Sequence, residues 1–571
     1  MANIEEIFAV QKYIEPDQDM KGDTGRYGMV SSAVKEATDA GNEMLKKGGN
    51  AFDAVIAVQL ALSVVEGMNT GIGSGGFLMC YDAEKDETKM INAHPKAPAA
   101  MTPETFVDEN GEEIPFDERS THGTAVGIPS IMKGLKHLHE NYATLPLETL
   151  IDPAIRLAES DYRVHGLMER TLELFDHRLH EEARKKFMPG GTHLKEGDTL
   201  RQPELAHTLR TIRDKGFDDV YEGEIADAII KAVKDHGGIM THQDLLNYEV
   251  IVDEPLWTNY RGFDIALPVP PSAGGIGVAM QLKILEQVDI SQYNPHSVEK
   301  YHLMAQTLQL ALADKNAHIE DTNFTPAPLD GVLHEDYIKE RLEELSIERK
   351  AEKKEAGDPW KYQKDGHSPR EQGEPSGREG METTHYTAVD QWGNVAACTT
   401  SIERIYGSGI MVPGYGFILN NHLTDFSVEP GSVNEPNGNK YPKSSKSPAI
   451  LFHDGKPFFT LGSPGAATII ASVVQTIVNV IDYKMPIDEA IKDPRVYVTP
   501  DLDDQWEDGV EDAVLEKLAD LGYEFDQSFR EEGADTRIGD VQAIMIDQNN
   551  DHRLYGGADF PRPGDAKAVE D

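Results

Sequence analysis

The chain has 571 residues, of which 39% are hydrophobic and 7% aromatic, a composition typical of a globular protein with a large core. Its 99 acidic and 54 basic side chains give a formal net charge of −45. A surface of that charge repels nucleic acids and anionic membranes, so we expect neither as a partner.

The sequence also lacks the patterns of disulfide-rich, metal-binding and membrane proteins. Cys80 and Cys398 are its two cysteines, which allow no disulfide framework and no multi-cysteine metal site. The histidines have no metal-ligand spacing, so we expect no metal and no cofactor. No stretch approaches 18 apolar residues, and the first residues lack a basic start followed by an apolar run. We therefore expect a cytoplasmic protein.

The first elements along the chain are two helices and two strands. Residues 33–47 have the periodicity of an amphipathic helix. Asn50 is suited to cap a second, more apolar helix over 51–65. Strand-like runs follow at 77–81 and near 88–93.

Helical periodicity dominates from residue 130 to residue 350, and the composition then changes. Residues 348–382 are rich in Glu, Lys, Pro and Gly and offer few side chains to bury. Such a segment does not offset the entropy lost on ordering, so we expect an exposed, mobile linker. Beyond it we expect strands at 384–389, 395–402 and 541–547, a hairpin at 449–462, and helices at 466–482 and 510–521. Strands between helical blocks predict sheets covered by helices.

The junction between this linker and the next strand holds a possible nucleophile, Thr383. A threonine hydroxyl is a weak nucleophile that needs a base beside it. An N-terminal threonine carries such a base in its own α-amine, whose pKa is about 8. That amine exists only if the Glu382–Thr383 bond is broken, and a linker that leads into a strand suits such a break. Taken alone, however, a threonine at the start of a strand is usually structural.

Motifs spread from residue 27 to residue 566 favour a functional role for Thr383 at this junction. They include Lys47-Gly-Gly-Asn-Ala-Phe-Asp-Ala54, Gly71-Ile-Gly-Ser-Gly-Gly-Phe77, Pro270-Pro-Ser-Ala-Gly-Gly275, Thr383-Thr-His-Tyr386 and Gly462-Ser-Pro-Gly465. In this order they resemble the γ-glutamyltranspeptidase family of N-terminal-nucleophile hydrolases. The resemblance implies an α+β fold, the four-layer αββα sandwich of those hydrolases.

The resemblance also implies a precursor that cuts itself between Glu382 and Thr383. A large-subunit region, 1–382, and a small-subunit region, 383–571, would remain associated as a heterodimer within one intertwined domain. Thr383 would attack a small γ-glutamyl compound such as glutathione and form a γ-glutamyl-enzyme. The acyl group would then pass to water, an amino acid or a peptide, which divides a difficult amide cleavage into two easier steps.

Four positions match residues that act together with the nucleophile in this family. Thr399 matches a threonine that assists maturation, and Ser401 matches a threonine that hydrogen-bonds the nucleophile; serine keeps that hydroxyl. Gly465 and Ala466 match a Gly-Gly pair whose backbone amides form an oxyanion hole. Alanine keeps the N–H but is restricted where φ is positive.

Five further positions carry over to substrate binding. Glu403 and Asp425 match positions that hold the α-amino group of the donor, and Ser444 and Ser445 match a serine pair beside its carboxylate. The family usually has Arg-Glu-x-Ala-Pro, whose arginine binds that carboxylate, where this chain has His94-Pro-Lys-Ala-Pro98. His94 does not reproduce a two-pronged guanidinium contact. Lys96 would supply a positive charge from nearby, but only as a point charge. His422 also departs from the family pattern, with no predicted effect.

Two other patterns have simpler interpretations. Gly71, Gly73 and Gly76 satisfy G-x-G-x-x-G, but they follow a helix and open a strand, the reverse of a dinucleotide site. We expect a tight glycine loop there instead. His385 would be a base in a serine-type scheme, but adjacent strand residues point to opposite faces. We therefore expect His385 to face away from Thr383.

Two alternative functions remain open. The missing arginine favours a related acylase or amidohydrolase that acts on a side chain other than γ-glutamyl, such as glutaryl. The other alternative is an unprocessed homologue that only binds γ-glutamyl compounds or a partner. The intact Thr383, serine pair and Gly462-Ser-Pro-Gly465 loop argue against it.

Overall fold

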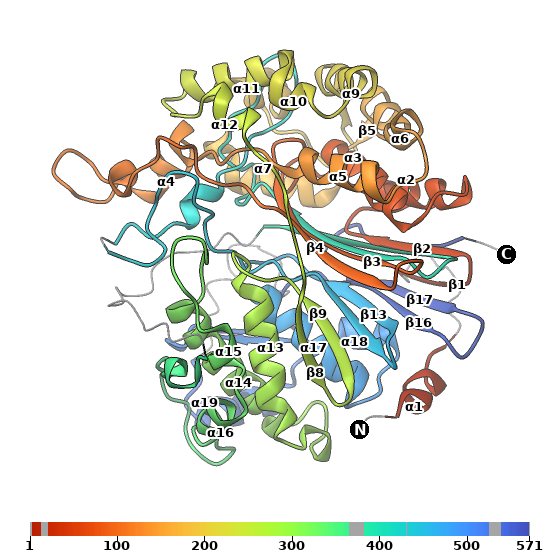
Figure 1. Cartoon of the computed structure of the whole chain (residues 1–571), viewed down its shortest axis with the longest axis vertical. Coiled ribbons are helices and arrows are strands. Elements are labelled where there is room, and N and C mark those ends of the chain that lie inside the picture. Colours follow the sequence, from red (N-terminus) through yellow and green to blue (C-terminus); the bar gives the residue numbers. More distant parts are fainter. Residues whose placement is uncertain (1–2, 13–20, 365–381, 430, 525–537, 570–571) are drawn as a thin grey trace.

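Two stacked antiparallel sheets, each with seven strands among the described residues, form the centre of the molecule (Figure 1). The structure, a computed structural model, describes residues 3–12, 21–364, 382–429, 431–524 and 538–569. Helices cover the outer face of each sheet, so the layers follow the order helix, sheet, sheet, helix. The predicted four-layer αββα sandwich is confirmed.

The strand order interleaves the two halves of the chain. The first sheet runs through β18 (Asp565–Ala568), β2 (Gly28–Ser32), β10 (Thr384–Asp390), β11 (Val395–Ser401), β3 (Gly75–Asp82), β4 (Glu87–Ala93) and β7 (Ile251–Asp253). The second runs through β1 (Gly22–Gly25), β17 (Arg553–Ala558), β16 (Gln542–Asp547), β13 (Lys456–Gly462), β12 (Ala449–His453), β9 (Phe263–Leu267) and β8 (Leu256–Tyr260). Each sheet therefore contains strands from both sides of Thr383.

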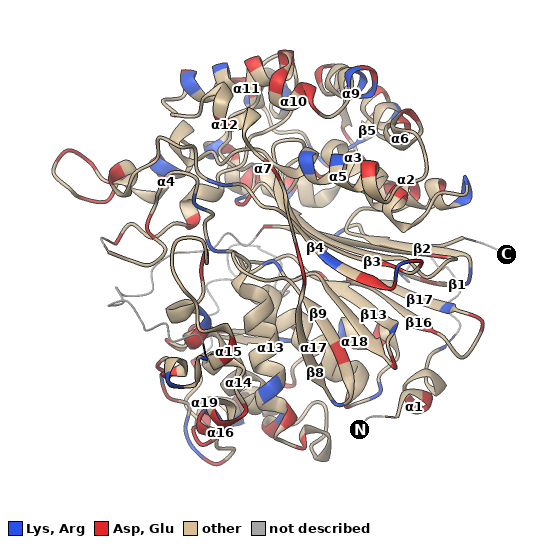
Figure 2. Ribbon diagram, viewed as in Figure 1, with Lys and Arg blue, Asp and Glu red and all other residues tan. Residues whose placement is uncertain are grey.

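Helices from different parts of the chain cover the two sheets. Over the first sheet lie α2 (Lys35–Lys46), α3 (Ala51–Val65), α5 (Ile131–Asn141), α6 (Leu147–Glu159), α9 (Pro203–Lys215) and α11 (Glu224–Asp235). Over the second lie α13 (Ala273–Glu286), α14 (Val298–His318), α17 (Thr468–Ile481), α18 (Ile487–Lys492) and α19 (Asp512–Asp520). Charged residues lie mainly on the outermost helices and on the loops, while the strands carry few of them (Figure 2).

The helix α3 shows how local sequence sets an element. The side-chain oxygen of Asn50 accepts from the backbone N–H groups of Phe52 and Asp53, and the Asp53 carboxylate accepts from the Asn50 N–H at 2.7 Å. This reciprocal capping box satisfies donors that a helix start would leave exposed. All 15 residues of α3 are buried, which explains why its sequence is apolar on every side.

Alternation along β10 assigns each of its faces to a different core. Tyr386 and Ala388 pack into the core under the helices, while Val389 packs between the two sheets. The inter-sheet core also holds Phe77 from β3 and Ile544 from β16. Odd-numbered residues of β10 therefore face the second sheet.

Two predictions about elements need correction. The mostly helical interpretation of residues 130–350 misses β7, β8 and β9, which lie between 251 and 267. β7 and β8 are edge strands, where half-exposed residues break the apolar pattern. β9 lies one strand further in, between β12 and β8, and is a short, mostly buried run.

The predicted linker 348–382 also differs in part. Residues 365–381 lie outside the described residues. The part up to residue 364 has many exposed side chains but is held in place, because Ala351 is buried and the Gly357 N–H donates to Asp314 Oδ1 at 2.8 Å.

The described residues contain no helix that combines the length and the apolar character needed to cross a bilayer. Cys80 and Cys398 are both buried, and burial raises the pKa of each thiol, as expected for inert core cysteines.

The glycine loop before β3 allows close backbone approach. A Cβ at Gly73 would lie 2.2 Å from the Ile418 carbonyl oxygen, and one at Gly76 would lie 2.1 Å from the Thr399 carbonyl oxygen. The loop follows α3 and opens β3, as predicted, so it is a packing device rather than a dinucleotide site.

We expect Gly76→Ala to lower the free energy of unfolding by about 2 kcal/mol, because the new methyl group would push β3 away from β11. Gly67→Ala is the matched control, since its Cβ would meet nothing closer than the Ser63 carbonyl oxygen at 3.6 Å. Urea denaturation midpoints measure both variants. Equal midpoints for the two variants would contradict the close-approach argument.

Candidate active site

Thr383 lies at the entry to β10, 2% exposed, in the wall of a small cavity. The described residues that line it are Thr383, Glu403, Asp425, Ser444, Ser445, Lys446, Ala466 and Ile469. Six of these are residues that the sequence predicts for the site. Positions up to 83 residues apart in the chain are therefore brought together around the threonine (466 − 383 = 83).

Hydrogen bonds hold the backbone carbonyl groups of both residues at the Glu382–Thr383 junction. The Ser401 hydroxyl, at the end of β11, donates to the Glu382 carbonyl oxygen at 2.6 Å and accepts from the Glu403 N–H at 2.8 Å. On the other side, Arg562 donates to the Thr383 carbonyl oxygen at 2.5 Å and pairs with Glu66 at 2.8 Å. The Glu382–Thr383 unit is thus fixed before any reaction.

Close to Thr383, a buried hydroxyl–imidazole pair joins β10 to β11. Thr399 lies opposite His385 in the β10–β11 register, and its hydroxyl is 2.9 Å from His385 Nδ1. Both side chains are fully buried, and burial lowers the pKa of His385 to about 3. The imidazole is therefore neutral at working pH.

Our prediction that His385 faces away from Thr383 rests on a wrong count. The two residues are two positions apart, and strand residues two apart share a face. The ring of His385 lies against Gly462 of β13, where a Cβ would come within 2.3 Å of it, so it occupies the space between the sheets.

Carboxylates from two loops reach the cavity. Glu403 follows β11 with φ +82, a left-handed conformation that is rare outside glycine. Its carboxylate oxygen lies 3.4 Å from Lys446 Nζ. Asp425 ends the short 3₁₀ helix His422–Asp425 and is 4% exposed. Strained backbone of this kind persists where the surrounding structure holds it, which is common at functional sites.

The serine pair is fixed by the loop that opens α13. The Ser444 carbonyl oxygen accepts from the Ala273 N–H at 2.7 Å, and the buried Lys315 ammonium donates to Ser445 Oγ at 2.8 Å. A Cβ at Gly274 would lie 2.1 Å from the Ser445 carbonyl oxygen, so glycine is required there. These contacts explain why the Pro270–Gly275 motif accompanies the serines in the sequence.

The loop before α17 carries two adjacent backbone N–H groups, those of Gly465 and Ala466, and Ala466 lines the cavity. Gly465 has φ +121 and Ala466 has φ +55, and α17 begins two residues later. No group among the described residues accepts a hydrogen bond from either N–H. Amides near the positive end of a helix favour an anion.

His94 lies outside the lining of the cavity. It is fully buried, stacks on Phe77 with ring centroids 5.2 Å apart, and meets the ring of His422 edge-on at 4.8 Å. Burial, and then the nearby Lys446 ammonium, hold the pKa of His94 well below its ordinary value. His94 is therefore neutral and supplies no positive charge.

Lys96 does not reach the cavity either. Its ammonium lies 5.4 Å from the ring centre of Tyr248 and 6.0 Å from that of Tyr441, and it is absent from the lining. The cation at the cavity is instead Lys446, which the sequence interpretation missed although it directly follows the serine pair. Arg562 was also missed, because nothing in its local sequence marks it.

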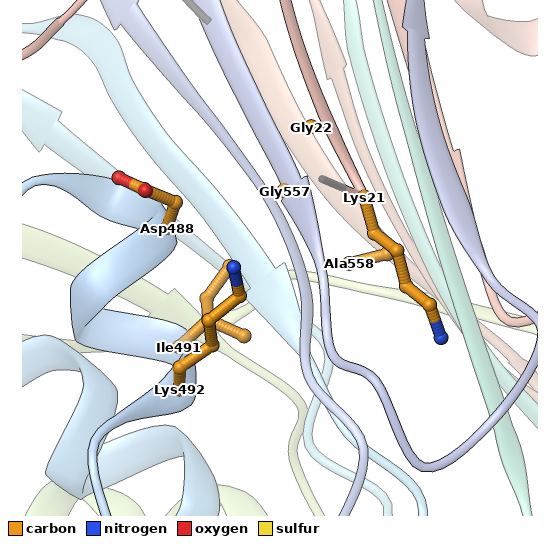
Figure 3. A pocket seen from close by; sticks show the side chains of 7 residues that line it. All are labelled: Lys21, Gly22, Asp488, Ile491, Lys492, Gly557 and Ala558. Atoms are coloured by element: carbon orange, nitrogen blue, oxygen red, sulfur yellow. The ribbon is translucent and has the colours of Figure 1, made fainter. Parts of the chain in front are cut away.

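A separate hollow lies between α18 and the strands β1 and β17 (Figure 3). It is lined by Lys21, Gly22, Asp488, Ile491, Lys492, Gly557 and Ala558. None of the predicted site residues lies in its wall. Within the described ranges, no group of three or more His, Cys, Asp or Glu side chains is close enough to hold a metal ion.

Comparison with known proteins gives consistent matches along most of the chain. A sequence profile described as Gamma-glutamyltranspeptidase matches residues 37–569. A glutathione hydrolase proenzyme of Bacillus subtilis (strain 168) is 45% identical over 97% of this chain and 93% of its own length. An Acylase ACY 1 proenzyme of Pseudomonas sp. (strain SE83) is 31% identical over 96% of this chain and 94% of its own length. The crystal structure of a cephalosporin acylase from Bacillus halodurans has a TM-score of 0.84 at 26% identity and covers 98% of this chain and 99% of its own.

We expect Ala466→Gly to raise the free energy of unfolding by about 0.5 kcal/mol. Relief of the left-handed strain outweighs the added entropy of the unfolded chain. Ala467→Gly is the matched control, because Ala467 has φ −64 and gains nothing from glycine. It should lose about 0.5 kcal/mol, because glycine adds entropy to the unfolded chain. Urea denaturation of both variants measures the difference, and an equal loss in both would show that position 466 is unstrained.

Proposed function

The chain belongs to the gamma-glutamyltranspeptidase family, and we propose that it is a self-processing threonine-nucleophile enzyme that cleaves γ-glutamyl compounds such as glutathione. The observation that carries this proposal is the Ser401 hydroxyl, 2.6 Å from the Glu382 carbonyl oxygen. The Glu382–Thr383 peptide bond lies next to a cavity lined by Thr383 and five other predicted residues. The proenzyme names of the relatives are consistent with processing of this chain.

In the self-cleavage step, the Thr383 hydroxyl adds to the carbonyl carbon of Glu382. Ser401 donates a hydrogen bond to the carbonyl oxygen as negative charge develops there. The C–N bond then breaks, the nitrogen takes up the proton, and an ester joins Glu382 to the threonine oxygen. Water hydrolyses this ester, which leaves a carboxylate on Glu382 and a free amine on Thr383.

The products, 1–382 and 383–571, would stay together as a heterodimer, because strands of both fragments pair within each sheet. The new amine then accepts the hydroxyl proton of its own residue. Thr383 attacks the γ-carbonyl carbon of the donor, the amine product leaves with a proton, and an ester-linked acyl-enzyme remains. Water or an amino group then takes the acyl group from the threonine.

The surrounding groups match the charges of this chemistry. The amides of Gly465 and Ala466 would hold the oxyanion, and the Glu403 and Asp425 carboxylates would hold the α-amino group of the donor. Ser444 and Ser445 would donate to its α-carboxylate. We place Thr399 in maturation, where its hydroxyl on β11 holds the imidazole of His385 on β10, the strand that Thr383 enters.

A second candidate function is an acylase for donors without an α-amino group, such as glutaryl amides. The neutral, buried His94 favours it, because that position supplies no guanidinium to a donor carboxylate. The similarity to an acylase proenzyme and to a cephalosporin acylase structure is consistent with it.

We expect the purified protein to run on a denaturing gel as fragments of 382 and 189 residues, since 571 − 382 = 189. Thr383→Ala should remain one band, because the attacking hydroxyl is lost. Ser401→Ala should be cut at least about 100-fold more slowly, because the carbonyl oxygen loses its donor. Mass spectrometry of the fragments locates the cut. A single full-length band in an active wild-type preparation would contradict the mechanism.

We expect γ-glutamyl anilide to be hydrolysed at least about 30-fold faster, by kcat/KM, than glutaryl or succinyl anilide, because donors without an α-amino group leave Glu403 and Asp425 without a cation. Release of the aniline measures all three rates. Equal or faster turnover of the two deaminated donors would favour the acylase instead.

A further inference from the structure

Lys446 is the cationic residue among the described lining of the Thr383 cavity. Its side chain is 4% exposed, so its ammonium is removed from bulk water. The loop Ser444–Ser447, held against the start of α13, fixes the backbone from which it extends. A buried ammonium at a reaction cavity needs anionic or polar acceptors, and its partners indicate how strongly it is already bound.

The present contacts of Lys446 Nζ are long. It lies 3.4 Å from Glu403 Oε2, 3.2 Å from His422 Nε2 and 3.5 Å from Ser444 Oγ. Charge-assisted hydrogen bonds between an ammonium and a carboxylate are about 2.7–2.9 Å. An ammonium also has three donors, and none of the three contacts has that short geometry. The ammonium can therefore turn toward an anion that enters the cavity beside Ser444.

The other basic side chains near Lys446 supply no positive charge to the part of the cavity beside Ser444. His94 and His422 are fully buried, and burial, with the Lys446 ammonium as the next cause, holds the pKa of each imidazole well below its ordinary value. Lys96 faces the rings of Tyr248 and Tyr441 instead. Lys315 is not among the lining residues, and its ammonium donates to the Oγ of Ser445, which is one of them.

We infer that Lys446 binds the carboxylate carried by the acyl chain of the donor and so determines its specificity. This inference rests on the proposed function and names the group that recognises its substrate. The carboxylate would lie between Lys446 and the Ser444 hydroxyl, while Glu403 and Asp425 remain for the amino group. The class of acyl group accepted is therefore one that carries a carboxylate.

A competing role for Lys446 is to neutralise Glu403 only. In that case, removing the lysine would leave the Glu403 carboxylate free to bind the amino group of the donor. The effect on kcat/KM would then be the same for donors with and without a carboxylate. Two anilides separate these roles. L-γ-Glutamyl anilide carries both groups, and 4-aminobutyryl anilide is the same molecule without the carboxylate.

The experiment compares kcat/KM of both anilides in wild type, Lys446→Met, Lys446→Arg and Lys96→Met. Methionine matches the length of the lysine stem without its charge. For Lys446→Met we expect about a 30-fold loss on the γ-glutamyl donor, mainly through KM, and less than a threefold change on 4-aminobutyryl anilide. Lys446→Arg should recover most of the discrimination, and Lys96→Met should behave as wild type. The 382- and 189-residue fragments on a gel verify folding of each variant.

Equal losses on the two anilides in Lys446→Met would overturn the inference, as would an unchanged rate on the γ-glutamyl donor. If wild type hydrolyses neither anilide, the proposed γ-glutamyl activity fails separately. Glutaryl and butyryl anilide, which again differ by one carboxylate, then provide the same comparison. In that pair, a carboxylate preference that survives in Lys446→Met would reject the role of Lys446.

Discussion

The antiparallel pairing of β10 with β11 is the constraint on which the rest of the site depends. Its register places Thr384 opposite Thr400 and His385 opposite Thr399, and it ends β11 at Ser401. Because strand geometry is regular, this register also sets where the preceding Glu382 carbonyl lies, within reach of the Ser401 hydroxyl. The pair is central in its sheet, between β2 and β3, so neighbouring strands hold both of its edges.

Around this rigid pair, the structure assembles its polar groups from loops that the core holds in unusual conformations. Glu403 and Ala466 both have positive φ without being glycine. Gly274 is packed so closely against Ser445 that no side chain fits. The cost of each conformation is small compared with the burial that surrounds it, and its effect is to aim a carboxylate, an amide or a hydroxyl at one small space.

The sequence predicts best where local signals agree. The bounds of α3 follow from its cap at Asn50 and its apolar run, and the six predicted lining residues follow from motifs compared along the whole chain. Edge strands such as β8 were missed, because their half-buried residues do not alternate clearly. The position of the Lys446 ammonium depends on a contact with Glu403, 43 residues away, which no local pattern encodes. The face of His385 was predictable, since it depends only on counting by two.

The interleaved strand order has a consequence for how the protein can be made. A chain that folds before it is cut needs one unimolecular search, because β2 and β10 belong to the same polypeptide. Once the bond before β10 is broken, the same sheets can form again only if two separate fragments meet, so reassembly becomes concentration-dependent. The processed protein would therefore hold its structure through a slow rate of unfolding rather than through ready refolding.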